Sequence, residues 1–225
     1  MTALAPRPTD ALASVSAADD RLLRTVERMR PEQLLEPSAL PGWTRGHVLT
    51  HIARNADALV NLLTGARTGT PVPMYPSMEA REQAIEAGAR RPLDEQLADL
   101  RATAQRFAAA AAAVPDPAWT VEVPHRTGAF PAWKVPQKRY GELEYHHVDL
   151  GLDDYTPAQW PADFVSQELD PLAARHLGAG ALDAELLEKI GSAPGYARLA
   201  WLSGRSDGSD LGVPGSDLPA LPPLS

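Results

Sequence analysis

The stretch Gly141-Glu142-Leu143-Glu144-Tyr145-His146-His147 contains the residues that decide how this chain folds and what it can bind. Glu142 and His146 are four positions apart, and on a helix this spacing places both side chains on one face, one turn apart. His51 lies much earlier, in another segment with helical periodicity. Two imidazoles and one carboxylate from facing helices can bind a metal ion and leave positions open for chemistry. On spacing alone, three unrelated polar residues are the alternative.

Apolar residues recur at intervals of three and four along most of the chain, which predicts a mainly α fold. Proline and glycine positions divide the pattern into helices over 9–30, 44–63, 77–89, 93–114, 135–150, 162–176, 182–190 and 196–202. Gly65 is expected to end the second helix and Gly204 the last. A short extended piece is expected around 121–123. The four longer helices predict an antiparallel bundle whose metal ligands face inward.

The predicted domains follow from this pattern. Residues 9–155 are assigned to a metal-binding helix bundle and residues 160–212 to a small C-terminal domain. Residues 213–225 combine Gly, Ser, Asp and Pro, which predicts a flexible tail.

Composition excludes several classes of function. The net charge is -8, which argues against nucleic acid as a partner, because neutralising phosphates requires a basic face. The chain contains no cysteine, so disulfides, thiolate ligands and a cysteine nucleophile are all excluded. Any thiol in the chemistry must therefore arrive on a cofactor. No apolar run reaches the roughly 18 residues that span a membrane. The first residues do not have the pattern of a signal peptide, so a cytoplasmic location is expected.

Two segments carry a family resemblance. Leu40–Asn55 (Leu-Pro-Gly-Trp-Thr-Arg-Gly-His-Val-Leu-Thr-His-Ile-Ala-Arg-Asn) resembles the N-terminal signature of the mycothiol-dependent maleylpyruvate isomerase family. This family belongs to the DinB-like superfamily of metal-binding four-helix proteins. Glu142–Gly151 resembles the second signature, and Met74–Gly88 and Tyr196–Gly208 look like a third and a fourth. The resemblance implies a DinB-like four-helix bundle.

The resemblance also implies a site and a reaction. It implies that His51, Glu142 and His146 bind a divalent metal ion, with zinc as the first choice. It also implies that mycothiol binds at the coordination position that the protein leaves open. It implies that Arg81 and Arg205 are catalytic residues facing the cleft, where a guanidinium can bind a carboxylate through two hydrogen bonds. The implied reaction is cis-trans isomerisation of maleylpyruvate or a similar unsaturated keto acid. A metal-activated thiolate adds to the double bond, the resulting single bond rotates, and the thiolate leaves.

Two other functions keep the same site. A mycothiol S-transferase would stop at the adduct with an electrophile, for detoxification or biosynthesis. A non-catalytic metal- or thiol-binding regulator would show no turnover. The expected partners are a small-molecule thiol and an anionic or electrophilic substrate, with no nucleic acid and no membrane. The chain is expected to be a monomer or a weak homo-oligomer. The metal also stays open, because a site of two His and one Glu suits zinc but also nickel, iron or cobalt.

The sequence departs from the family in two places. Family members often have Arg immediately before the ligand Glu, whereas here Gly141 stands there and Arg139 lies two positions earlier. Residues 177–195 lack the alternating β-branched run of the small sheet that relatives carry. The small C-terminal domain is therefore expected to be shortened, which bears on any substrate contact that it supplies.

Four neighbours of the candidate ligands have separate expectations. His47, one turn before His51, is an alternative ligand that the resemblance places outside the site. His147 and Glu144 turn away from the ligand face, so His147 is expected at the surface or the edge of the core and Glu144 in solvent. Asp149 shares the face of Glu142 and is a candidate acceptor that orients an imidazole.

Overall fold

The computed structural model describes residues 7–126 and 128–222. The chain divides into two compact units, Met1–Gly151 and Leu152–Ser225. The predicted mainly α fold is confirmed, because the described residues form eight α-helices and one two-stranded sheet. No helix among these described residues is both long enough and apolar enough to cross a membrane.

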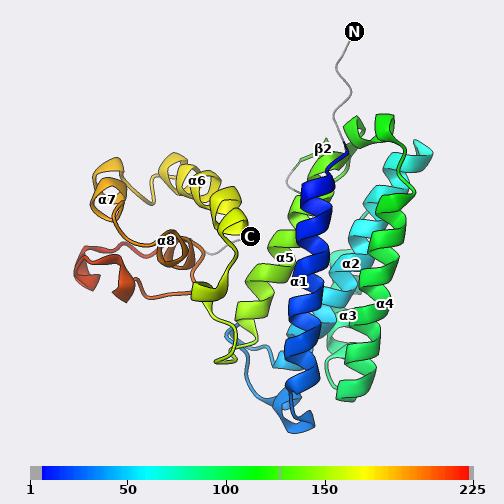
Figure 1. The fold of residues 1–225 in the computed structure, drawn as a ribbon, viewed down its shortest axis with the longest axis horizontal. Helices are drawn as coiled ribbons and strands as arrows, with labels where there is room; N and C mark the ends of the chain where they lie inside the picture. The colour runs from blue at the N-terminus through cyan, green and yellow to red at the C-terminus, as the bar shows by residue number, and fades with distance from the viewer. Residues whose placement is uncertain (1–6, 127, 223–225) are drawn as a thin grey trace. The chain divides into compact units, whose positions relative to one another are not determined.

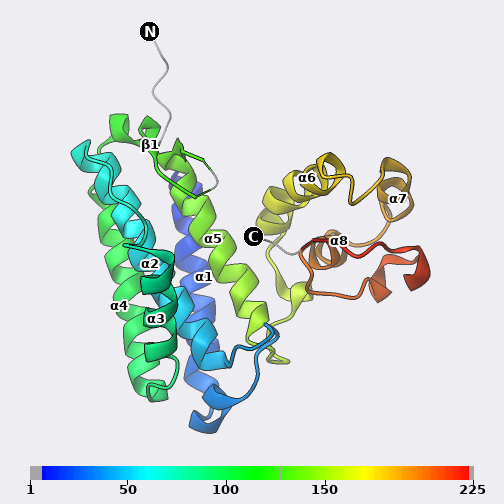
Figure 2. The same ribbon diagram turned by 180° about the vertical axis from the view of Figure 1, so that it is seen from behind.

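A bundle of four long helices forms the first unit (Figures 1 and 2). These helices are α1 (Thr9–Arg28), α2 (Arg45–Thr68), α4 (Leu93–Ala112) and α5 (Val135–Asp149). Helix α1 packs against α4 and α5, and α2 packs against the same two helices. Aliphatic side chains from each helix are buried between them, including Leu22, Ile52, Leu100 and Leu143. Removing this apolar surface from water is the main source of stability of the bundle.

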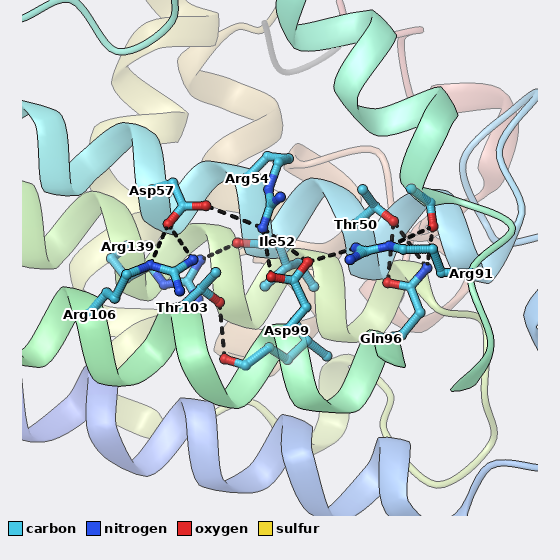
Figure 3. Close-up of polar contacts among 12 residues, drawn as sticks. Thr50, Ile52, Arg54, Asp57, Arg91, Gln96, Asp99, Thr103, Arg106 and Arg139 are labelled. Atoms are coloured by element: carbon cyan, nitrogen blue, oxygen red, sulfur yellow. Dashed lines mark hydrogen bonds and ion pairs between the residues drawn. The ribbon is translucent and has the colours of Figure 1, made fainter. Parts of the chain in front are cut away.

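The bundle is not fully antiparallel, so the prediction on this point is wrong. Thr50 of α2 bonds Gln96 of α4, and further along both helices Arg54 pairs with Asp99 (Figure 3). The residue numbers rise together, so α2 and α4 are parallel neighbours. The short helix α3 (Met78–Gly88) packs beside α2 and lies between α2 and α4 in the chain. It carries the chain back, so that α4 can begin at the same end of the bundle as α2.

Local sequence signals explain where α2 and α3 begin and end. The side chain of Ser77 accepts a hydrogen bond from the N–H of Ala80 at 3.0 Å, which caps α3 as predicted. The predicted end of α2 at Gly65 is wrong, because the helix continues until Gly69 adopts φ 72°. Gly65 instead leaves room for the returning loop, since a Cβ there would lie 3.1 Å from the nitrogen of Val72.

A short hairpin precedes α5. Strands β1 (Glu122–Val123) and β2 (Phe130–Pro131) pair antiparallel, close to the predicted extended piece. The hairpin lies between the end of α4 and the start of α5 in the chain, and α2 packs against β1.

The second unit is also helical. It contains α6 (Ala162–Gly178), α7 (Ala184–Lys189) and α8 (Gly195–Leu202), and α6 packs on α8. Gly204 follows α8 with φ 75°, as predicted. The described part of the second unit, residues 152–222, contains no strand. Within the predicted flexible tail, Gly215–Asp217 forms a 3-10 turn, and residues 223–225 lie outside the described residues.

Candidate metal centre

The three candidate ligands converge between α2 and α5. These helices run antiparallel, so that Arg45 at the start of α2 bonds the carbonyl of Leu150 just after α5. This arrangement brings His51 Nε2 within 3.0 Å of both Glu142 Oε2 and His146 Nε2. His146 Nε2 lies 3.4 Å from the same Glu142 oxygen. One ligand atom from each residue lies within 4.8 Å of the others.

These separations suit coordination of a single ion. Ligand atoms about 2.1 Å from a tetrahedral metal ion are about 3.4 Å from one another. The cluster already has nearly this spacing, so small side-chain adjustments suffice to surround an ion. His51 is buried, whereas Glu142 and His146 are partly exposed, so solvent and small molecules have access to the cluster.

The protonation states of His51 and Glu142 also favour a cation. Burial, with His146 nearby, lowers the pKa of His51 to about 4, so its imidazole is neutral near pH 7. Burial alone would raise the pKa of Glu142, but hydrogen bonds with His146 and His51 outweigh it and hold the pKa well below the usual value. A neutral imidazole and an ionised carboxylate are the forms that bind metals.

Asp149 contacts the ring of His146. Its Oδ2 lies 2.8 Å from His146 Nδ1, and Asp149 itself is almost fully buried. Burial alone would lower the pKa of His146, but Asp149 and Glu142 raise it above its ordinary value. When Nδ1–H donates a hydrogen bond to Asp149, Nε2 of the neutral ring keeps a lone pair directed at the cluster. The predicted contact between Asp149 and an imidazole of the cluster is present, and its role in orienting His146 stays a prediction.

A guanidinium lies at the edge of the cluster. Arg81, on α3, places Nη2 3.2 Å from His51 Nδ1. Its guanidinium carbon is 5.9 Å from the centroid of the Tyr75 ring. Among the described residues, Arg81 forms no ion pair with a carboxylate. The sequence motif around Met74 includes Tyr75, but sequence reasoning gave this ring no role.

His47, the alternative ligand, has hydrogen-bonding partners outside the cluster. His47 Nδ1 lies 2.8 Å from Thr44 Oγ1, and its Nε2 lies 3.0 Å from Glu86 Oε2, so His47 is outside the cluster. Trp43 packs over the site, with its ring centroid 5.5 Å from that of His51.

The expectations for Glu144 and His147 are wrong, because both side chains are buried. Glu144 forms an ion pair with Arg21, and His147 Nε2 lies 2.9 Å from Thr25 Oγ1. Both partners belong to α1, which covers the face of α5 opposite the ligands. Helical periodicity shows that these residues leave the ligand face, but it does not show which helix covers them.

Arg205 belongs to the second unit. Its Nη1 donates to the carbonyl of Ser203 at 3.0 Å. Its role in catalysis stays a prediction.

Comparison with known proteins identifies relatives of both the sequence and the fold. Residues 15–151 match the family described as Mycothiol maleylpyruvate isomerase N-terminal domain. A crystal structure of the mycothiol-dependent maleylpyruvate isomerase aligns at 25% identity and TM-score 0.82, covering 95% of this chain and 96% of that chain. The structure of its histidine-to-alanine mutant aligns at 24% identity, with the same TM-score and coverage. No match is found among curated proteins.

Coverage of both chains is nearly complete, so the expected shortening of the C-terminal domain is not seen against this structure. The family match spans more than half of the chain and includes the segments that carry the three candidate ligands. The chain belongs to the mycothiol-dependent maleylpyruvate isomerase family.

Proposed function

We propose that this protein catalyses cis-trans isomerisation of maleylpyruvate or a similar unsaturated keto acid, with mycothiol as cofactor. Membership of the family supports this proposal, as does the activity named for the relative with the same fold. One observation on this chain supports the proposal independently of family membership. A guanidinium without a carboxylate partner among the described residues lies directly beside a three-ligand cluster.

His51, Glu142 and His146 would hold the metal ion, for which zinc is our first choice. When bound by three protein ligands, such an ion keeps a position open and lowers the pKa of a thiol that binds there. Glu142 contributes the negative charge, and Asp149 keeps the proton of His146 at Nδ1. The chain has no cysteine, so the thiol must come from a separate molecule.

Arg81 would bind a carboxylate of the substrate. Its two terminal nitrogens can donate in parallel to the two oxygens of one carboxylate, a geometry that fixes orientation as well as charge. A substrate held in this way lies next to His51, and therefore next to the ligand cluster. Maleylpyruvate has two carboxylates, and we assign the second to Arg205 on the family resemblance alone.

The test compares two substrates. The zinc-loaded protein is incubated with mycothiol and either maleylpyruvate or a neutral electrophile such as monochlorobimane. The proposal predicts conversion of maleylpyruvate to the trans isomer with no net loss of mycothiol. Consumption of mycothiol in proportion to the electrophile, without isomerisation of the keto acid, would instead support an S-transferase. The absence of turnover with either substrate would favour a binding protein.

A further inference from the structure

Arg139 is a buried cation that connects three helices of the bundle. It lies on α5, three residues before Glu142, and its exposed fraction is 0%. Its Nη1 donates to the carbonyl of Ile52 on α2 at 2.8 Å (Figure 3). The same Nη1 lies 3.4 Å from Asn55 Oδ1, also on α2. Its Nη2 pairs with Asp19 Oδ1 of α1 at 3.1 Å.

This arrangement is costly if its only purpose is packing. Taking a guanidinium out of water costs several kcal/mol, which pairing repays only when the geometry is good. The Nε of Arg139 has no hydrogen-bond partner among the described residues. Burial also raises the pKa of Asp19 in spite of its pairing with Arg139. An apolar side chain of similar volume would often stabilise such a position as well or better.

The contact with Ile52 gives Arg139 a specific position relative to the metal cluster. Ile52 directly follows His51, so its carbonyl belongs to the same helical turn as that ligand. Arg139 therefore fixes the turn of α2 that carries His51 against the part of α5 that leads into Glu142. The same two helix segments hold His51 Nε2 at 3.0 Å from Glu142 Oε2.

We propose that Arg139 is a positioning residue of the metal centre. It holds α2 at the distance from α5 at which His51 can share one ion with Glu142 and His146. The inference rests on the metal centre proposed above, and it adds a residue that touches none of the ligand atoms. Asp19 compensates the buried charge from the α1 side.

A second ion pair of α5, in which the carboxylate is buried, provides a matched control. Glu144 pairs with Arg21 of α1, so this pair fastens α5 to α1 and not to α2. Replacing Glu144 should cost stability in the same way as replacing Arg139. It should leave the spacing between α2 and α5 unchanged, so it separates general destabilisation from an effect on the cluster.

The experiment uses Arg139→Gln, Arg139→Lys and Glu144→Gln in the full chain. Three quantities are measured: the Tm of the metal-free protein, the Kd for Zn²⁺ by chelator competition, and the visible spectrum of the Co²⁺-substituted protein. Both Gln variants should lower Tm. Only Arg139→Gln should weaken Zn²⁺ binding, by about 10- to 100-fold as for other groups that support metal ligands, and alter the Co²⁺ bands. Arg139→Lys keeps the charge but has one terminal nitrogen in place of the two that bond Ile52 and Asp19, so its effect should be intermediate.

Two results would overturn the role of Arg139. One is a Zn²⁺ affinity and Co²⁺ spectrum of Arg139→Gln that match the parent. The other is an equal loss of affinity in Glu144→Gln. If Arg139→Gln does not fold, Arg139→Lys decides by the same criteria. A parent protein that binds no Zn²⁺ overturns the metal centre as well, whereas a parent and variants that bind equally overturn only the role of Arg139.

Discussion

Substituting Arg81 by Lys tests whether the guanidinium beside the cluster binds substrate. The substitution keeps the positive charge on α3 but replaces a planar fork with a single ammonium. In the structure, Nη2 of Arg81 already reaches within 3.2 Å of His51, so a carboxylate bound by this group would lie next to the cluster. The single terminal nitrogen of Lys can bond one carboxylate oxygen well, but it cannot bond both oxygens in parallel.

The size of the effect follows from the hydrogen bond that is lost. A hydrogen bond to a charged group contributes about 1.5–3 kcal/mol. We therefore expect kcat/KM for maleylpyruvate to fall by about ten- to a hundred-fold. The metal content should not change, because Arg81 is not among the three ligands.

The assay measures kcat and KM at saturating mycothiol, together with zinc content. Arg90→Lys is the control, since Arg90 is an exposed residue just after α3 and should tolerate the same change. If Arg81→Lys retains the parent kcat/KM for an anionic substrate, Arg81 is only a surface cation. That result would favour an uncharged electrophile as the acceptor, as for an S-transferase.

Three other predictions concern the thiol, the pH and the support of His146. Because the chain has no cysteine, no isomerisation should occur without an added low-molecular-weight thiol, and full activity in thiol-free buffer would contradict the mechanism. The raised pKa of His146 stabilises the metal-free fold below pH 6.5, and this contribution is lost as pH rises through the raised value. The proton then competes less with zinc, so the rise in Tm on adding zinc should be larger near pH 8 than near pH 6; calorimetry showing the reverse would be evidence against this linkage. Asp149→Asn should weaken zinc binding by about 10- to 100-fold in chelator competition, and an unchanged affinity would show that the contact with His146 is unimportant.

Local sequence patterns predict most of the helices and the shared face of Glu142 and His146. The spacing of Glu142 and His146 determines a shared face wherever the segment is helical, so this part of the site needed no tertiary information. Ser77 and Gly204 act through the backbone of their own turns, and both were recognised. His51 was linked to the other two by family resemblance, because spacing alone left unrelated polar residues as an alternative.

Contacts between distant helices could not be predicted in this way. The pairing of Asp19 with Arg139 spans 120 positions, and that of Arg21 with Glu144 spans 123. The sequence around Glu144 suggests a solvated side chain, because only the packing of α1 against α5 buries it. The parallel arrangement of α2 and α4 depends on the path of the chain through α3, which helix lengths do not reveal. Gly65 makes room for a neighbouring loop and does not mark a helix end, a difference that the local sequence does not reveal.

Zinc analysis of the purified protein tests the central claim most directly. After loading with zinc and dialysis, the parent should retain about one ion per chain, as a site with three protein ligands would. His51→Ala and His146→Ala should each lose most of it. His47→Ala should keep it, because His47 lies one turn away on the same helix and bonds Thr44 and Glu86 instead. Full zinc occupancy in both His51→Ala and His146→Ala would contradict the account and place the metal elsewhere.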